Sequence, residues 1–186
     1  MAAMEPGAAR MKVNQFIRIK KVYDQFRTEL LKAGRLPVKD TGKGFWAISV
    51  PDDIFDLFKK IDLHEYGSFL DLGSGDGRVV MIASLFTRAA GIEYDEELHN
   101  KAMEIKGSLG MDCELHNKDY MEHDFSGYDV VFLNPDQRLH SLEPKLLSEL
   151  KGRLVVYGDE FHPVSLVKDR TFHAHSTQVT IYHNRT

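Results

Sequence analysis

The sequence has one cysteine and one tryptophan in 186 residues, and it contains no long hydrophobic run. A single cysteine, Cys113, cannot form an internal disulfide, and it excludes a zinc site built from clustered cysteines. No apolar stretch approaches the roughly 18 residues of a membrane span, and no secretory signal core follows the N-terminus. These absences exclude a disulfide-stapled secreted module, a membrane protein and a fibrous repeat. We therefore expect a soluble, cytoplasmic protein of one domain with a terminal extension.

Positive charge is concentrated near the N-terminus. Residues 1–43 hold ten Lys or Arg and four Asp or Glu, a net charge of +6, whereas the whole chain carries −4, so the remainder carries −10. A basic arm at residues 11–43 can bind an acidic partner such as a nucleic acid, or it can pack on its own acidic body. We favour packing, because apolar residues recur every three or four positions from Met11 to Ala33 and predict an amphipathic helix.

Three segments of the chain differ in pattern. Residues 1–10 are small and predict a flexible leader, residues 11–44 predict a basic helical extension that ends in a polar loop, and residues 45–186 form the main domain. A second helix is expected to begin at Pro51, because proline suits a first helical turn.

Buried strands alternate with helices from residue 68 onward. Strands are expected at 68–72, 89–94, 112–117, 128–133 and 153–157, and helices at 79–86, 96–109 and 141–150. The alternation predicts an α/β fold, a parallel sheet with helices on both faces. The last β segments, 171–175 and 178–183, have no helix between them and predict a terminal hairpin with one antiparallel strand.

A glycine-rich loop directly after the strand at 68–72 carries the main chemical signal. Gly73, Gly75 and Gly77 stand at alternate positions. Glycines allow a sharp turn and the close approach of a ligand, and ligands of open α/β sheets bind at the carboxyl ends of the strands. Nicotinamide-dependent enzymes have G-x-G-x-x-G, but Arg78 stands where that third glycine is required. This spacing disfavours an oxidoreductase.

Two acids follow at later strand ends. Glu93 ends the second strand, twenty residues after Gly73, where a carboxylate can accept hydrogen bonds from both hydroxyls of a ribose. Asp119 follows the third strand. It can accept a hydrogen bond from the exocyclic amine of an adenine, or it can be an ordinary loop residue.

The ordered motifs, with the strand at 128–134 and the terminal hairpin, resemble those of class I S-adenosylmethionine-dependent methyltransferases over residues 45–184. The resemblance implies a Rossmann-like seven-stranded sheet and S-adenosylmethionine as cofactor. Asp71 and the loop backbone would hold the methionine end, Glu93 the ribose, and Asp119 with the Tyr120 amide the adenine. The cofactor-binding residues it implies are Asp71, Gly73, Ser74, Gly75, Gly77, Glu93, Tyr94, Asp119, Tyr120 and Asn134.

Two runs, at residues 71–80 and 142–150, resemble those of the small archaeal-type protein-lysine methyltransferases, as do Val155-Val156 and Asp159-Glu160-Phe161. This resemblance implies methyl transfer to the amine of a protein lysine. The end of the fourth strand departs from the related base and glutamine N-methyltransferases. They have a second proline and an aromatic residue where this chain has Asp136 and Gln137.

The lost aromatic ring would stack on a flipped base, a contact worth about 1–3 kcal/mol. Its absence disfavours a base as substrate, but N-methylation of RNA or DNA stays open as the alternative. A third possibility, from a different class, is a non-catalytic subunit that binds S-adenosylmethionine.

The candidate catalytic residues are Asn134, Pro135, Asp136 and Glu160. Asn134 and Pro135 can orient the amine. Carboxylates near the strand ends, including Asp159, can guide a lysine ammonium, or they can simply be solvated.

No metal site is expected, because the nine histidines show no metal-ligand spacing. Cys113 is expected to be a small buried apolar residue. Trp46 either folds over the cofactor pocket, as the resemblance implies, or packs in the core. The expected partner is a protein substrate, with nucleic acid possible through residues 11–43.

Overall fold

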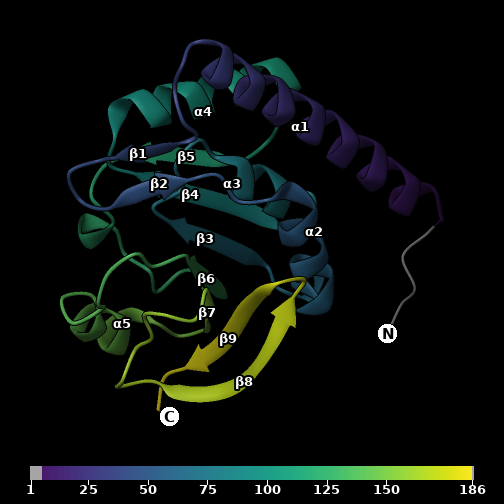
Figure 1. Cartoon of the computed structure of the whole chain (residues 1–186). Helices are drawn as coiled ribbons and strands as arrows, with labels where there is room; N and C mark the ends of the chain where they lie inside the picture. Colours follow the sequence, from purple (N-terminus) through teal and green to yellow (C-terminus); the bar gives the residue numbers. More distant parts are fainter. Residues whose placement is uncertain (1–5, 186) are drawn as a thin grey trace.

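The computed structural model describes residues 6–185, and its centre is a sheet of seven strands (Figure 1). The strands are β3 (Ser68–Leu72), β4 (Arg88–Glu93), β5 (Glu114–Asn117), β6 (Val130–Leu133), β7 (Arg153–Tyr157), β8 (Val167–Ala174) and β9 (Thr177–His183). Their order across the sheet is β5-β4-β3-β6-β7-β9-β8. β9 runs antiparallel to β7 and β8, whereas the pairs from β5 to β7 are parallel. The predicted α/β fold with an antiparallel terminal hairpin is confirmed.

Successive residues of a strand point to opposite faces of the sheet, so each face has its own apolar surface. Different helices cover these two surfaces. Phe69 of β3 packs in a core with α2 (Pro51–Lys60), α3 (Arg78–Ala83) and α4 (Glu96–Leu109). Its neighbour Leu70 packs in a second core with α5 (Glu143–Glu149). Two short 3-10 helices, η1 (Leu63–Glu65) and η2 (Tyr120–Glu122), lie in the connections. With both faces covered, the carboxyl ends of the parallel strands remain open to a ligand.

The basic arm forms α1 (Pro6–Lys32), which lies on α3 and α4 (Figure 1). Its buried apolar residues are Phe16, Ile19, Tyr23 and Leu30. Other members of the predicted apolar stripe, Val13, Ile17 and Leu31, are exposed, so the buried face is narrower than the sequence pattern indicated. Packing of the arm on the body is confirmed for the buried residues.

α1 begins at Pro6 and not at Met11, so residues 6–10 of the predicted leader are helical. The pattern of small residues was misleading, because Pro6 fits a first helical turn and the alanines that follow favour a helix. Residues 1–5 of the predicted leader lie outside the described residues.

The segment predicted as a polar loop contains a hairpin of β1 (Val38–Asp40) and β2 (Phe45–Ala47). Lys39 pairs with Trp46 across it, and Asp40 pairs with Phe45. Each strand has only three residues, which is too short for an alternation of apolar and polar residues to be recognised in the sequence. These strands were therefore not predicted from the sequence. The predicted boundary between residues 44 and 45 falls inside this hairpin.

The remaining elements differ from expectation only at their ends. α3 stops at Ala83 instead of Phe86, and β5 and β6 each begin two residues later than predicted. Among residues 6–185, no helix combines the length and the apolar character that a membrane crossing requires.

Candidate active site

The glycine loop after β3 turns through three left-handed residues. Gly73, Gly75 and Gly77 have φ values of 78°, 54° and 78°, which favour glycine over any residue with a side chain. The Gly73 and Ser74 amides both donate to the carbonyl oxygen of Ile92 in β4, at 2.9 and 2.8 Å. Gly77 then stands at the N-cap of α3. The glycines therefore form the sharp turn that was predicted, and the loop is held against the end of the neighbouring strand.

Glu93 is buried at the end of β4, and its side chain is hydrogen bonded to the glycine loop. Its carboxylate accepts from the Gly75 amide and from the Asp95 amide, each at 2.7 Å. Burial raises the pKa of Glu93, and these backbone donors oppose the rise. A carboxylate has about four lone-pair sites, so Glu93 retains acceptor capacity for the hydroxyls of a ribose.

Asp71, in the middle of β3, is buried beneath the loop. Its burial, together with the nearby charges of Glu93 and Asp76, raises its pKa well above the ordinary value. The pair Asp76 and Arg78 sits beside it, with the guanidinium Nε 3.0 Å from one carboxylate oxygen and Nη2 2.5 Å from the other.

Arg78 is a residue whose part in the site the sequence did not reveal. Its Nη1 donates to the Ser49 carbonyl at 3.0 Å, and its guanidinium stacks 4.7 Å from the ring centroid of Tyr23 in α1. Tyr23 in turn donates from its hydroxyl to the Asp76 carbonyl at 2.8 Å. The loop is thus tied to α1 and to the segment before α2. The only sequence signal was an arginine at a position where nicotinamide enzymes have glycine.

A cavity of about 590 Å³ opens over the carboxyl ends of β3, β4 and β6. It is lined by residues predicted to contact the cofactor or substrate, namely Gly73, Glu93, Tyr94, Asp119, Tyr120, Asn134, Pro135 and Asp136. A smaller cavity of about 60 Å³ adjoins Asp71, Ser74, Asp76 and Arg78. Gly73, Asn134, Phe45 and Trp46 line both cavities. The structure thus brings most of the predicted site residues to one place and puts Trp46 among them.

Asp119, the acid predicted to bind the adenine, is paired with a lysine of the β1–β2 hairpin. The Asp119 carboxylate accepts from the Met121 amide at 2.9 Å and forms an ion pair with the Lys43 ammonium. Burial would raise the pKa of Asp119, but the contacts with Lys43 and Met121 outweigh it and lower the pKa. Lys43 also lies 4.3 Å from the centroid of the Tyr94 ring.

The candidate catalytic residues are not all brought together. Asn134 and Pro135 line the larger cavity, and the Asp136 carboxylate accepts a hydrogen bond from the Phe45 amide of the hairpin. Asp159 and Glu160 are exposed, and neither lines the two cavities of the site. The prediction for Glu160 assumed that it stays near the end of β7, but the chain turns at Gly158, whose φ is 127°, and leaves both acids in water.

The segment of the chain that carries most of these site residues matches a known protein family. Residues 48–145, which include the glycine loop, Glu93, Asp119 and Asn134, match the model of the family described as histone methylation protein DOT1. The chain belongs to the DOT1 family. A comparison with curated proteins finds no match.

Solved structures similar to this DOT1 family member include methyltransferases with different substrates. An RNA methyltransferase from Salinibacter ruber, in complex with S-adenosyl-L-homocysteine, has 26% identity and a TM-score of 0.63, over 75% of this chain and 95% of its own. The tRNA (m1A58) methyltransferase TrmI from Aquifex aeolicus has 15% identity and a TM-score of 0.57, over 75% and 70%. The mitomycin 7-O-methyltransferase MmcR has 14% identity and a TM-score of 0.59, over 72% and 53%. The last two show the shared fold alone.

The family, the sheet order and the loop identify an S-adenosylmethionine-dependent methyltransferase. The residues present fit this cofactor. Three left-handed glycines admit close approach, Glu93 offers a buried acceptor, and the cavity between Glu93, Asp119 and Asn134 has apolar walls from Leu72, Leu133 and Leu139.

Proposed function

We propose that this protein transfers a methyl group to the ε-amine of a lysine in a protein. The supporting observation is the match to a family described by histone methylation, over a segment that holds the glycine loop and Asn134. The basic arm also favours a protein substrate over a nucleic acid. Its residues Lys20, Arg35 and Lys39 form ion pairs with acids of the same chain, so they are less available to bind phosphates.

The cofactor-binding residues are proposed as the sequence predicted them. Asp71, Gly73, Ser74, Gly75 and Gly77 would hold the methionine end of the cofactor, and Glu93 the ribose. Tyr94 and Asn134 are the other residues proposed to contact the cofactor. Asp119 with the Tyr120 amide would hold the adenine. S-adenosylmethionine, when bound, supplies an electrophilic methyl group, and the chain itself contributes position.

Asn134 and Pro135 have the proposed catalytic part. They follow β6 directly and line the larger cavity, where we place both the cofactor and the incoming amine. The Asn134 side-chain oxygen can accept a hydrogen bond from the amine and hold its lone pair in line with the methyl group. A free lysine has a pKa of about 10.4, so the amine must lose its proton before it attacks. The apolar side chains of Leu72, Leu133 and Leu139 line the larger cavity and favour the neutral amine over the ammonium.

Asp136 and Glu160 have weaker proposed parts. The Asp136 carboxylate is hydrogen bonded to the Phe45 amide, so it can attract a lysine ammonium only while it also holds the hairpin. Glu160 is exposed and could act only on a substrate that approaches from solvent.

RNA methylation is the second candidate function. It is supported by the Salinibacter ruber RNA methyltransferase, which covers 75% of this chain at 26% identity. The two functions differ in the polymer that carries the methyl group.

The test is incubation of the protein with methyl-tritiated S-adenosylmethionine and a total cell extract, followed by protease or ribonuclease. Label that becomes acid-soluble with protease and resists ribonuclease supports a protein substrate, and mass spectrometry should then place the methyl group on lysine. Label released by ribonuclease overturns the proposal in favour of RNA. A Gly75→Val protein, which should not bind the cofactor, is the control for label from other enzymes.

A further inference from the structure

The β1–β2 hairpin occupies positions that a cofactor needs. Trp46 lies against the glycine loop so closely that a Cβ atom on Gly75 would stand 2.3 Å from its Cδ1 atom and 2.7 Å from its Nε1 atom. The glycines allow a ligand to come close to the loop backbone. In this structure the indole of Trp46 occupies that space beside Gly75.

Lys43 occupies a second such position. Its ammonium is paired with Asp119, the acid whose expected partner is the exocyclic amine of the adenine. The Lys43 carbonyl also accepts from Gln137 Nε2 at 3.0 Å. A cation of the hairpin therefore holds the acceptor that the cofactor would use.

The hairpin divides the site in two. Asp71 faces the cavity of about 60 Å³, whereas Glu93 and Asp119 face the cavity of about 590 Å³. Phe45 and Trp46 stand on the wall between the two cavities. A single cofactor that reaches from Asp119 to Asp71 has to pass the place where these rings now lie.

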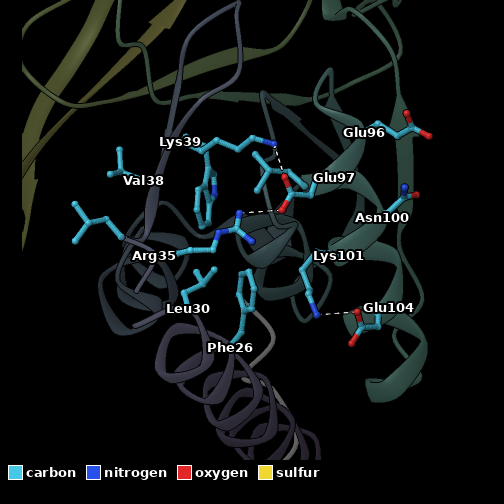
Figure 2. Close-up of a pocket in the computed structure, with 13 residues that line it drawn as sticks. Phe26, Leu30, Arg35, Val38, Lys39, Glu96, Glu97, Asn100, Lys101 and Glu104 are labelled. Atoms are coloured by element: carbon cyan, nitrogen blue, oxygen red, sulfur yellow. Dashed lines mark hydrogen bonds and ion pairs between the residues drawn. The ribbon is translucent and has the colours of Figure 1, made fainter. Parts of the chain in front are cut away.

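Space for the displaced indole exists on the other side of the hairpin. A third cavity, of about 800 Å³, lies between α1, β1 and α4 and has Trp46, Phe26 and Leu30 in its wall (Figure 2). Arg35, Lys39 and Glu97 line this cavity. The ion pairs of Lys39 with Asp95 and Glu97 and of Arg35 with Glu97 anchor the start of the hairpin. Figure 2 shows Arg35 and Lys39 both directed toward Glu97.

We propose that the β1–β2 hairpin is an internal competitor of the cofactor, with Lys43 on Asp119 and Trp46 on Gly75, and that cofactor binding displaces both. The bound form then has Trp46 moved away from the loop toward the third cavity. This inference concerns the cofactor and holds for a protein or an RNA substrate.

The first test uses Trp46, the one tryptophan of the chain, as a reporter. Tryptophan fluorescence is titrated with S-adenosylhomocysteine, which lacks the sulfonium charge, and quenching by acrylamide is measured with and without saturating ligand. We expect a saturable change in emission and faster quenching in the complex, because the indole leaves the loop. Binding that calorimetry detects, with emission and quenching both unchanged, overturns the displacement of Trp46.

The second test removes the competing charge. Lys43→Gln should lower the Kd of S-adenosylhomocysteine about threefold or more, since a binding-competent form that is only partly populated weakens apparent affinity. Salt should tighten binding to the intact protein, because it screens the pair of Lys43 with Asp119, and should leave Lys43→Gln unaffected. Lys21→Gln is the matched control, since Lys21 is exposed on α1 and does not line the cavities of the site.

A Lys43→Gln protein that melts like the intact protein but binds the ligand equally or more weakly overturns the competition by Lys43. Failure of either test leaves the methyl-transfer assay untouched, so the two proposals fail separately.

Discussion

The Glu93 carboxylate accepts a hydrogen bond from the Gly75 amide, with 2.7 Å between oxygen and nitrogen, and joins the end of β4 to the tip of the glycine loop. The same carboxylate accepts from the Asp95 amide at the start of α4. Glu93 thus helps to fix the shape of the glycine loop, and it is also proposed to accept hydrogen bonds from the ribose. Loss of its side chain should therefore weaken cofactor binding in two ways.

Glu93→Ala should therefore weaken S-adenosylhomocysteine binding severely. Charge-assisted hydrogen bonds contribute roughly 1.5–3 kcal/mol each, so the loss of two should raise the Kd about a hundredfold or more. Calorimetry on the folded variant measures this effect. Glu114→Ala removes an exposed acid at the start of β5, away from the cavities of the site, and should change the Kd far less. Unchanged affinity in Glu93→Ala would remove the ribose assignment.

Gly75→Val should abolish cofactor binding while the domain stays folded. The left-handed φ of 54° disfavours any side chain, and a valine side chain would enter the space proposed for the cofactor. Circular dichroism and calorimetry separate folding from binding. Gly107→Ala is the control, because a Cβ at Gly107, inside α4, meets nothing within 4 Å. A Gly75→Val protein with normal affinity would show that the loop does not contact the cofactor.

Asn134→Ala should reduce turnover much more than cofactor affinity. Its side chain is proposed to orient the amine, and a misplaced nucleophile costs about a hundredfold in rate. Single-turnover kinetics and calorimetry on the same preparation make the comparison. Parallel losses of both quantities would assign Asn134 to cofactor binding instead.

Tyr23→Ala tests whether α1 is part of the folded body. Tyr23 is 1% exposed and bonds to the Asp76 carbonyl, so its truncation should lower the free energy of unfolding by about 3–5 kcal/mol. Ile17→Ala, on the exposed side of the same helix, should change it by less than about 0.5 kcal/mol. Urea unfolding of both variants measures the difference. Similar small effects would indicate an arm that is not packed.

The salt dependence of RNA binding gives a separate test of the arm. Because Lys20, Arg35 and Lys39 of the arm are paired with acids of the same chain, the protein should bind RNA weakly and with a shallow dependence on salt. Binding of duplex phosphates would instead give a log–log slope of about −0.9 for each phosphate contacted. A steep slope that disappears when Lys20, Arg35 and Lys39 are changed to Gln would favour the RNA substrate.

Cys113 should be unreactive in the folded protein. Its burial raises the pKa of the thiol to about 11, so only a small fraction is thiolate at pH 8. Alkylation by iodoacetamide should be slow and should rise about tenfold for each pH unit up to that pKa, whereas the urea-unfolded chain should level off near pH 8.5. Rapid labelling at pH 7 without urea would contradict the buried position.

The sequence by itself determined the sheet, and it predicted most of the residues that line the cavities at the carboxyl ends of its strands. Buried strands such as Ser68–Leu72 show a local pattern, and the right-handed crossover rule leaves few ways to connect them. Glu93 and Asp119 were predictable because each follows a strand whose carboxyl end must lie at the same edge of the sheet. The preference for a packed arm also came from local pattern, through apolar residues such as Phe16 and Tyr23.

Only the tertiary structure decided what closes the site. The hairpin at Val38–Ala47 has strands of three residues, and its contacts join Lys43 to Asp119 and Phe45 to Asp136 across 76 and 91 positions of the chain. The exposure of Glu160 was also not evident from the sequence, because the turn at Gly158 directs the chain away from the end of β7. Local pattern reports which residues are buried along a strand or helix. It carries no information about which distant charge or ring fills a cavity, because that choice depends on packing in three dimensions.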